Sequence, residues 1–388
     1  SVGKGAITIL PFLDVDGNGR RDNGEPKVAG LKFRINGGTI VRNEKDSTIV
    51  EHAITTDGVE YYSYHESERG ETNVDEEKKK DDRKAVSLLW SPDSKYFVLN
   101  RTDERKVKDL WVINSITDPR PTLETYKYWM PGETEAPVDE ILLFDVASKK
   151  PRKLLISLFK DQSVEIFRKP SLRKNRDDDF APQLWLGNNN LFFINRTSRD
   201  LKRIDICRVD VATAQVATII EERLNTYVEI RAPGLVNDGK EIIQWSERDG
   251  WGHFYLYDET GKLKNQITSG AFHCDSIVGI DEKRRVLYFS ANGKEMVTTE
   301  KKSGITMEKE DPYYLHLYKI NFDGTGLMLL NEGNYNNSFN MDDNELYFVN
   351  TFSRVNTIPE SVLMDNNGKT ILKLETVDFT RILETGYK

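Results

Sequence analysis

Apolar and polar residues alternate in short runs along most of the chain, and this pattern predicts β-strands. Clear examples are 95–100 (KYFVLN), 190–195 (NLFFIN), 253–258 (HFYLYD) and 345–350 (ELYFVN). Gly, Asn, Asp or Pro bounds most of these runs, and Asp-Gly and Asn-Gly pairs give hairpin turn signals between them. No stretch of about 12 residues shows helical spacing of apolar positions between capping residues. The sequence therefore predicts an all-β chain.

The predicted strands recur as a unit of four, with a period of about 40–50 residues. The units lie at 86–154, 183–220, 235–270, 277–330 and 338–375, with a partial unit at 32–58. Such a period is typical of β-propeller blades, because sheets packed face to face around an axis bury both faces and leave only short edges. A β-sandwich would give fewer strands at irregular spacing. We therefore predict a β-propeller with about six units, the first of them incomplete. The predicted ring of blades is either closed or incomplete.

Two polar segments interrupt the repeats. Residues 65–84 are almost wholly polar with nearly balanced charge, which favours a solvated surface loop. Residues 115–140 form a Pro-punctuated insertion within one unit. A long insertion in a compact repeat is typical of a functional segment or an oligomer contact.

Charge and hydropathy exclude several partners. The 388 residues include 55 Lys and Arg against 63 Asp and Glu, which gives a net charge of −8. An acidic balance argues against nucleic-acid or anionic-membrane partners, because both bind clustered Lys and Arg. No apolar run reaches the length of about 18 residues that a membrane span needs, and no signal peptide is evident at the start. Cys207 and Cys274 lack metal-ligand spacing, so either one disulfide or two partly buried thiols fits them.

The N-terminal segment contains a calcium-loop pattern. Residues 14–25 (DVDGNGRRDNGE) match D-x-[DN]-x-[DN]-G-x5-E. The predicted ligands are side chains of Asp14, Asp16, Asn18, Asp22 and Glu25 with the backbone carbonyl of Arg20. The preceding residues are strand-like rather than helical, and residues 5–38 as a whole resemble a calcium-binding β repeat of surface proteins. A Gly- and Asp-rich turn without an ion remains the alternative.

From about residue 39 onward the chain resembles a known family. Residues 54–64, 88–114, 120–133 and 140–145 look like the N-terminal propeller of the dipeptidyl peptidase IV branch of the prolyl oligopeptidase family, and 266–295 and 348–369 agree. The most specific pieces are 90–96 (WSPDSKY) and 125–133 (TYKYWMPGE). We therefore predict two domains, an N-terminal β segment at 1–38 and the propeller at 39–388.

The resemblance also implies where chemistry occurs. In the family an α/β-hydrolase domain with Ser, Asp and His follows the propeller, but no G-x-S-x-G nucleophile motif occurs in these 388 residues. We therefore expect no catalytic residues in this chain, and no required cofactor beyond the calcium candidate. In the family the propeller binds the substrate amine with a Glu pair. The chain lacks the family-like Y-E-E context, and we interpret the adjacent Glu221 and Glu222 as a solvent-facing connection.

The candidate substrate-binding cluster is Arg101, Asp103, Glu104 and Arg105, which follow a predicted strand at a place that resembles an Asp-Glu segment of the family. A surface ion-pair ladder is an equally good interpretation.

Two functions stay open on sequence alone. In the first, the chain is the substrate-gating propeller of a dipeptidyl peptidase IV-like serine exopeptidase, with a peptide as its partner and the catalytic domain outside the chain. Alternatively, it is a non-catalytic exported scaffold propeller, stabilised by calcium. Family resemblance places both forms in the periplasm or at the cell surface. An exposed sheet edge would favour association, with a homodimer as a candidate.

Overall fold

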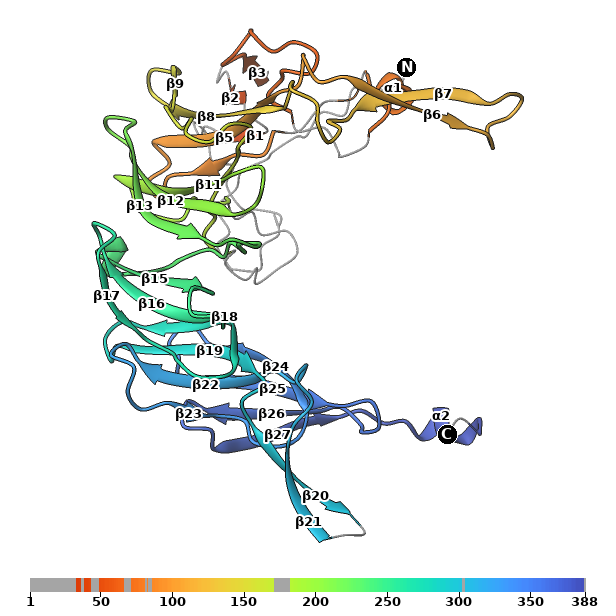
Figure 1. Cartoon of the computed structure of the whole chain (residues 1–388). Coiled ribbons are helices and arrows are strands. Elements are labelled where there is room, and N and C mark those ends of the chain that lie inside the picture. Colours follow the sequence, from red (N-terminus) through yellow and green to blue (C-terminus); the bar gives the residue numbers. More distant parts are fainter. Residues whose placement is uncertain are drawn as a thin grey trace, which may run out of the picture. The chain divides into compact units, whose positions relative to one another are not determined.

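The structure is a computed structural model that describes residues 33–35, 38–42, 49–65, 71–80, 82, 86–170, 182–301 and 304–386. Strands make up nearly all of its regular elements (Figure 1). Within the described residues there are five antiparallel four-stranded sheets, each built from strands that follow one another along the chain once two inserted hairpins are set aside. The predicted all-β class and the four-stranded repeat are confirmed.

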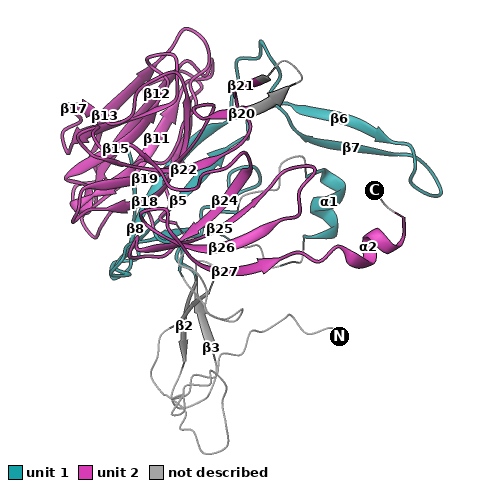
Figure 2. Ribbon diagram, turned by 90° about the horizontal axis from the view of Figure 1, so that it is seen from below, with its two compact units in different colours: residues 1–154, 171–184 teal, residues 155–170, 185–388 magenta. Residues whose placement is uncertain are grey.

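The chain divides into two compact units, coloured separately in Figure 2. Unit 1 comprises residues 1–154 and 171–184, and unit 2 comprises residues 155–170 and 185–388. Each unit is considered on its own below.

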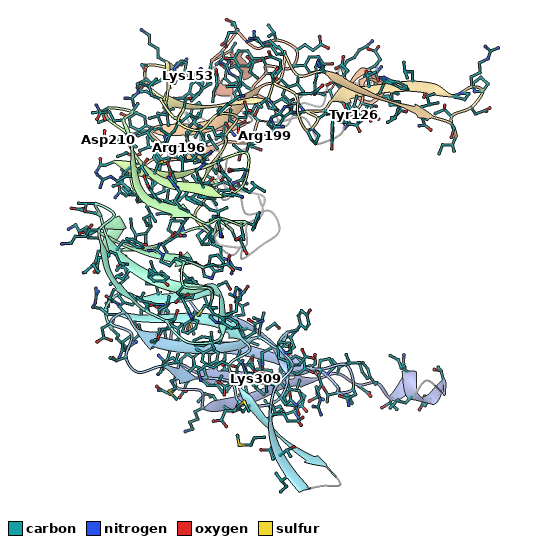
Figure 3. All side chains as sticks on the ribbon, in the orientation of Figure 1. Tyr126, Lys153, Arg196, Arg199, Asp210 and Lys309 are labelled. Atoms are coloured by element: carbon teal, nitrogen blue, oxygen red, sulfur yellow. The ribbon has the colours of Figure 1, made fainter. Side chains whose placement is uncertain are left out.

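Unit 1 contains one four-stranded sheet in the order β4-β5-β8-β9. Its strands are Leu89–Trp90, Tyr96–Asp103, Val138–Asp145 and Pro151–Lys153. The insertion between β5 and β8 forms a separate hairpin of β6 (Asp109–Asn114) and β7 (Thr122–Lys127), which carries Tyr126 (Figure 3). A small sheet joins β1 (Phe33–Ile35), β2 (Gly38–Arg42) and β3 (Ile49–His52).

Helix α1 (Asn73–Lys78) also belongs to unit 1 and lies in the segment that the sequence predicts to be a loop. Thr72 caps its N-terminus, and the Thr72 and Asp75 side chains each accept a hydrogen bond from the other's backbone N–H, which forms a capping box. The loop prediction for this segment is therefore wrong at these six residues. The cap supplies the start signal, and a one-and-a-half-turn helix is too short to show an apolar period.

The first two sheets of unit 2 have the orders β10-β11-β12-β13 and β14-β15-β16-β17. The first is built from Ser163–Ile166, Leu191–Thr197, Arg203–Asp210 and Val216–Arg223. The second is built from Gly234–Val236, Glu241–Ser246, His253–Asp258 and Leu263–Gln266, with the 3-10 turn η1 (Asn237–Gly239) between its first two strands.

Two further sheets complete unit 2. The sheet β18-β19-β22-β23 consists of His273–Asp281, Val286–Asn292, His316–Asn321 and Met328–Leu329, and the hairpin β20 (Met296–Lys301) and β21 (Gly304–Lys309) projects from it (Figure 1). The sheet β24-β25-β26-β27 consists of Asn336–Met341, Tyr347–Ser353, Glu360–Asp365 and Thr370–Thr376, and helix α2 (Thr380–Glu384) follows it.

The core of unit 2 lies between successive sheets, and strand alternation explains why. On β15, Ile242 packs with Phe193 and Ile206 of the preceding sheet, whereas its neighbour Ile243 packs with Leu287 and others of the following sheet. Both residues are fully buried. Because successive side chains point to opposite faces, one central strand stabilises both interfaces. This two-sided burial is the packing that a propeller blade requires.

Several details differ from the sequence-based predictions. The first strand of the 183–220 unit is β10 at Ser163–Ile166, whereas Trp185 and Gly187 form only isolated bridges. At Gly187 the backbone φ is +146°, and a Cβ there would lie 2.2 Å from the Leu191 carbonyl oxygen, so glycine is required. Cys207 and Cys274 are free and buried, which leaves the thiol interpretation. The predicted domain boundary after residue 38 stays a prediction.

Candidate functional site

Arg101 lies at the centre of a buried polar cluster in unit 1. The register of β5 and β8 places it directly opposite Glu140, and its Nη2 donates to Glu140 Oε2 over 3.1 Å. Its Nη1 donates to Asp57 Oδ2 over 2.9 Å. The guanidinium also stacks on two aromatic rings, 3.9 Å from the centroid of Tyr62 and 4.8 Å from that of Tyr64. Only 7% of Arg101 is exposed, so a planar, always-charged side chain is held by two carboxylates and two ring faces.

The charges of this cluster compensate one another. Burial opposes ionisation of Glu140, but hydrogen bonds from Lys153, Tyr62 and Arg101 lower its pKa below the ordinary value. Lys153, labelled on β9 in Figure 3, forms the outer ion pair with Glu140. Hydrogen bonds to Asp57 and Glu140 likewise raise the pKa of Arg101 against its burial. The charge and hydrogen bonds of Arg101 are thus used in contacts within unit 1, and these contacts stabilise the pairing of β5 with β8.

Asp103 and Arg105 form a surface pair at the end of β5. Arg105 donates from Nε to Asp103 Oδ1 over 2.8 Å and from Nη2 to Oδ2 over 2.6 Å. This contact is the main reason that the pKa of Asp103 lies below its ordinary value. Half of the Arg105 side chain is exposed, and its guanidinium lies 4.3 Å from the centroid of the Tyr62 ring. For these two residues the structure shows the ion-pair arrangement that the sequence left as an alternative.

Glu104 differs from its neighbours because its carboxylate is not directly paired. Its backbone N–H donates to the Tyr61 carbonyl over 2.9 Å, but within the described residues no hydrogen bond or ion pair reaches its carboxylate. Burial and the nearby Asp139 raise the pKa of Glu104, and Lys127 only partly opposes them. Asp139 itself accepts a hydrogen bond from Thr102 Oγ1 over 2.8 Å. Glu104 and Asp139 therefore form a pair of neighbouring carboxylates that repel each other.

The structure corrects the interpretation of Glu222. Side chains of β13 alternate, so Glu221 is exposed but Glu222 is only 5% exposed. Glu222 accepts a hydrogen bond from Ser246 Oγ over 2.7 Å and forms an ion pair with Arg248. Arg248 in turn stacks on Tyr255, 4.5 Å from its ring centroid. The solvent-facing interpretation is therefore wrong for Glu222, which joins two adjacent sheets.

The predicted calcium ligands, Asp14, Asp16, Asn18, Arg20, Asp22 and Glu25, lie outside the described residues. Among the residues that the structure does describe, no group of three or more His, Cys, Asp and Glu side chains is arranged to hold a metal ion. No helix in this part of the chain has both the length and the apolarity needed to cross a membrane. The calcium site stays a prediction.

The histidines of unit 2 have structural contacts. His253, His273 and His316 each begin a strand. His316 Nε2 lies 2.9 Å from Glu310 Oε2, and its Nδ1 lies 3.0 Å from the Asn331 carbonyl, all of them buried. These contacts anchor the end of the β20–β21 hairpin to β22.

Sequence analysis missed the partners of the candidate cluster. Asp57 and Glu140 lie about forty residues on either side of Arg101, and only the pairing of β5 with β8 across the inserted hairpin brings Glu140 to it. The available signal was Glu140 at the start of the apolar run 141–144, because an antiparallel partner of 96–103 would place it opposite Arg101.

Comparison with known proteins identifies the family. The model of the dipeptidyl peptidase IV (DPP IV) N-terminal region matches residues 44–359. The probable dipeptidyl-aminopeptidase B of Arthroderma gypseum is 24% identical over 336 residues, which cover 79% of this chain and 32% of the relative. The dipeptidyl peptidase 4 of Arthroderma otae is 24% identical over 216 residues, covering 53% of this chain and 26% of that protein.

Solved structures show the same fold. The crystal structure of Porphyromonas gingivalis dipeptidyl peptidase 4 superposes with a TM-score of 0.65 at 19% identity, covering 94% of this chain and 47% of that one. The chain therefore spans a third or less of these two curated relatives and about half of this solved structure. With a family model that matches most of its length, the chain belongs to the family of the dipeptidyl peptidase IV N-terminal region.

Proposed function

We propose that this chain is the non-catalytic, substrate-gating propeller of a dipeptidyl peptidase IV-like serine exopeptidase that acts in the periplasm or at the cell surface. Family membership supports a dipeptidyl peptidase component. The 388 residues contain no G-x-S-x-G motif, so the proposal assigns bond cleavage to a hydrolase domain outside this chain.

The observation that carries the proposal is the carboxylate pair of Glu104 and Asp139. Two neighbouring carboxylates attract an ammonium group, because one positive charge relieves their repulsion and burial strengthens the attraction. Burial and, after it, the nearby Asp139 raise the pKa of Glu104, and Glu104 remains partly open to solvent. A peptide that presents its free N-terminus would supply a further positive charge beside Glu104. The pair thus offers the amine-binding chemistry that the family resemblance assigns to a propeller.

Calorimetry with the tripeptide Ala-Pro-Gly tests this role. The wild-type chain should bind the free peptide and lose the interaction with its N-acetylated form, which has no ammonium group. Glu104→Gln should weaken binding of the free peptide by roughly tenfold, as expected for one charge-assisted contact. Glu135→Gln is the matched control, because Glu135 is exposed in the same unit and has no described partner.

The pH dependence provides a second readout. Affinity for the free peptide should fall as the pH drops through the raised pKa of Glu104, because a protonated carboxyl no longer attracts the ammonium. Equal affinities of wild type and Glu104→Gln, or of free and acetylated peptide, would contradict the proposed anchor.

A chromogenic X-Pro dipeptide tests the assignment of catalysis. The chain alone should not release the chromophore. A rate that depends on a serine nucleophile would overturn the assignment of bond cleavage to another domain.

One observation favours the scaffold alternative. Several large apolar side chains of the β6–β7 hairpin are exposed: Trp111, Ile113, Ile116 and Leu123. Exposed apolar groups of this size are typical of an interaction surface. If the chain binds no free-amine peptide but associates through this hairpin, the scaffold function is the better account.

A further inference from the structure

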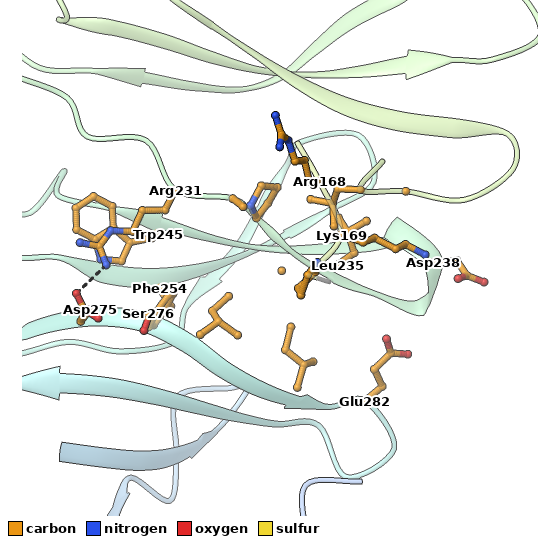
Figure 4. Close-up of a pocket in the computed structure, with 18 residues that line it drawn as sticks. Arg168, Lys169, Arg231, Leu235, Asp238, Trp245, Phe254, Asp275, Ser276 and Glu282 are labelled. Carbon is orange, nitrogen blue, oxygen red and sulfur yellow. Dashed lines mark hydrogen bonds and ion pairs between the residues drawn. The ribbon is translucent and has the colours of Figure 1, made fainter. Parts of the chain in front are cut away.

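A pocket of about 550 Å³ lies within unit 2, where β14 faces β18 (Figure 4). Further lining residues come from 168–170, which follow β10, from 186–187, from 231–233, from β15 and β16, and from the η1 turn. This volume is within the range of roughly 300–1,000 Å³ that is typical of small-molecule sites. All of its lining residues belong to unit 2. Neither Glu104 nor any residue of the Arg101 cluster lines the pocket.

The floor of the pocket is apolar and closely packed. It is formed by Leu235, Ile277 and Ile280, together with Gly234 of β14. A Cβ added to Gly234 would lie 2.7 Å from Ile280 Cδ1 and 2.8 Å from Ile277 Cδ1, so glycine lets both side chains cover the strand. An apolar ligand body would gain burial against this floor.

One end of the pocket is closed by charges that are already compensated. Arg231 forms ion pairs with Asp275 over 3.2 Å and with Glu229 over 3.0 Å. Its guanidinium stacks 4.3 Å from the centroid of the Trp245 ring (Figure 4). Glu282, at the other end, accepts a hydrogen bond from the Asn237 backbone over 3.1 Å. These groups shape the pocket, and their own charges or acceptors have partners.

Two charged residues of the lining remain uncompensated. Within the described residues, neither the Lys169 ammonium nor the Asp238 carboxylate has a hydrogen bond or an ion pair. Lys169 is partly buried and Asp238 is exposed. They are opposite in charge and line the same apolar cavity without pairing with each other, so the pocket offers one site for an anion and one for a cation (Figure 4).

We propose that this pocket binds a short apolar peptide with both termini free. Its ammonium group lies at Asp238, its carboxylate lies at Lys169, and its side chains pack against Leu235, Ile277 and Ile280. This binding site is separate from the Glu104 anchor and does not depend on the proposed peptidase role. A ligand with only one terminal charge satisfies only one of the two uncompensated residues.

Calorimetry with the dipeptide Leu-Leu tests the proposal. The wild-type chain should bind Leu-Leu more tightly than Gly-Gly, because only Leu-Leu has apolar side chains for the floor. Lys169→Gln and Asp238→Asn should each weaken Leu-Leu binding by roughly twofold to fivefold, the range for exposed ion pairs. Asn tolerates the positive φ of Asp238, +56°, so this variant should keep the backbone of the turn.

Blocked peptides assign each terminus to its residue. N-acetyl-Leu-Leu should bind wild type and Asp238→Asn equally, and Leu-Leu-amide should bind wild type and Lys169→Gln equally. Lys240→Gln is the matched control, because Lys240 is exposed at the η1 turn but does not line the pocket. It should bind Leu-Leu as wild type does.

Three results would overturn the proposal: no detectable binding of Leu-Leu, equal binding of Leu-Leu and Gly-Gly, or unchanged binding in both pocket variants. Glu104→Gln should leave Leu-Leu binding to the pocket unchanged. Failure of the pocket and failure of the Glu104 anchor are therefore distinguishable.

Discussion

The ion pair between Glu241 and Arg285 links two successive sheets of unit 2 and gives the sharpest stability prediction. Glu241 begins β15, and Arg285 lies in the turn between β18 and β19. Arg285 Nη1 donates to Glu241 Oε2 over 2.7 Å, and its Nη2 donates to Oε1 over 3.1 Å. Lys264 of β17 forms a second ion pair with the same carboxylate. Only 11% of the Glu241 side chain is exposed, so the contact holds the outer part of this interface.

The magnitude follows from the pKa of Glu241. Hydrogen bonds from Arg285, and then from Lys264, lower this pKa from 4.5 to about 2, although burial opposes them. That difference corresponds to at most about 3 kcal/mol of folding free energy at neutral pH. Arg285 and Lys264 are 45% and 44% exposed, so solvent screens the pair and we expect about 2 kcal/mol. Because the folded pKa is the lower one, this stabilisation is present above pH 4.5 and is lost as the pH falls toward 2.

Glu241→Gln removes the charge and keeps the shape of the side chain. Urea unfolding followed by tryptophan fluorescence should show a loss of about 2 kcal/mol at pH 7. At pH 3 the difference from wild type should fall to less than half of that value. Glu259→Gln, an exposed substitution of the same type in the β16–β17 turn, should change little at either pH. An equal loss at both pH values would refute the electrostatic origin, and no loss at pH 7 would refute the ion pair's contribution.

Three further predictions concern packing, calcium and association. Gly261→Ala should lower the free energy of unfolding by more than about 2 kcal/mol, because the residue has φ +86° and its Cβ would lie 1.8 Å from a backbone oxygen of the adjacent sheet. Gly250 has φ +94° but open space around it, so Gly250→Ala should lower that free energy by only about 1 kcal/mol in the same urea denaturation. Calcium should give a heat of binding when titrated into the wild-type chain, and Asp16→Ala should abolish that heat. Identical heats for the two chains would contradict the predicted calcium site. Replacing Trp111 and Ile113 by Ser should shift a homodimer toward monomer in light scattering after size exclusion, and an unchanged mass would exclude the hairpin as the contact.

The repeat could be predicted from the sequence because each central strand is long and carries the alternating pattern. The predicted strands 95–100, 190–195 and 253–258 coincide to within one residue at their start with β5, β11 and β16. Strands β19 and β22 pair with each other although an inserted hairpin separates them along the chain. The predicted unit 277–330 contains both strands. Strand β10 was missed, since four residues carry too little pattern to separate a strand from a loop.

The candidate site could be predicted only in part. The sequence singles out 101–105 as a polar segment after a strand, but it treats its charges as one group. In the structure these charged side chains have different surroundings, because neighbouring residues point to opposite faces of the strand and each side chain has a different partner. Arg101 pairs with Glu140, Arg105 pairs with Asp103, and the pKa of Glu104 is raised by burial and by the nearby Asp139. These differences depend on register with a strand about forty residues away, which local sequence does not contain.

Charge compensation separates the structural ions of both units from the residues that we propose to bind a ligand. A buried charge without a partner costs several kcal/mol, and the buried ions Arg101 and Glu241 are each held by two opposite charges. Glu104, Lys169 and Asp238 lack such partners among the described residues, and each keeps access to solvent that can be exchanged for a ligand. A ligand that supplies the missing charge therefore replaces only water and displaces no internal ion pair. The scaffold's own ion pairs need not break when a peptide binds, and this is the physical reason to seek binding at the partly exposed, uncompensated residues rather than at the strongest ion pairs.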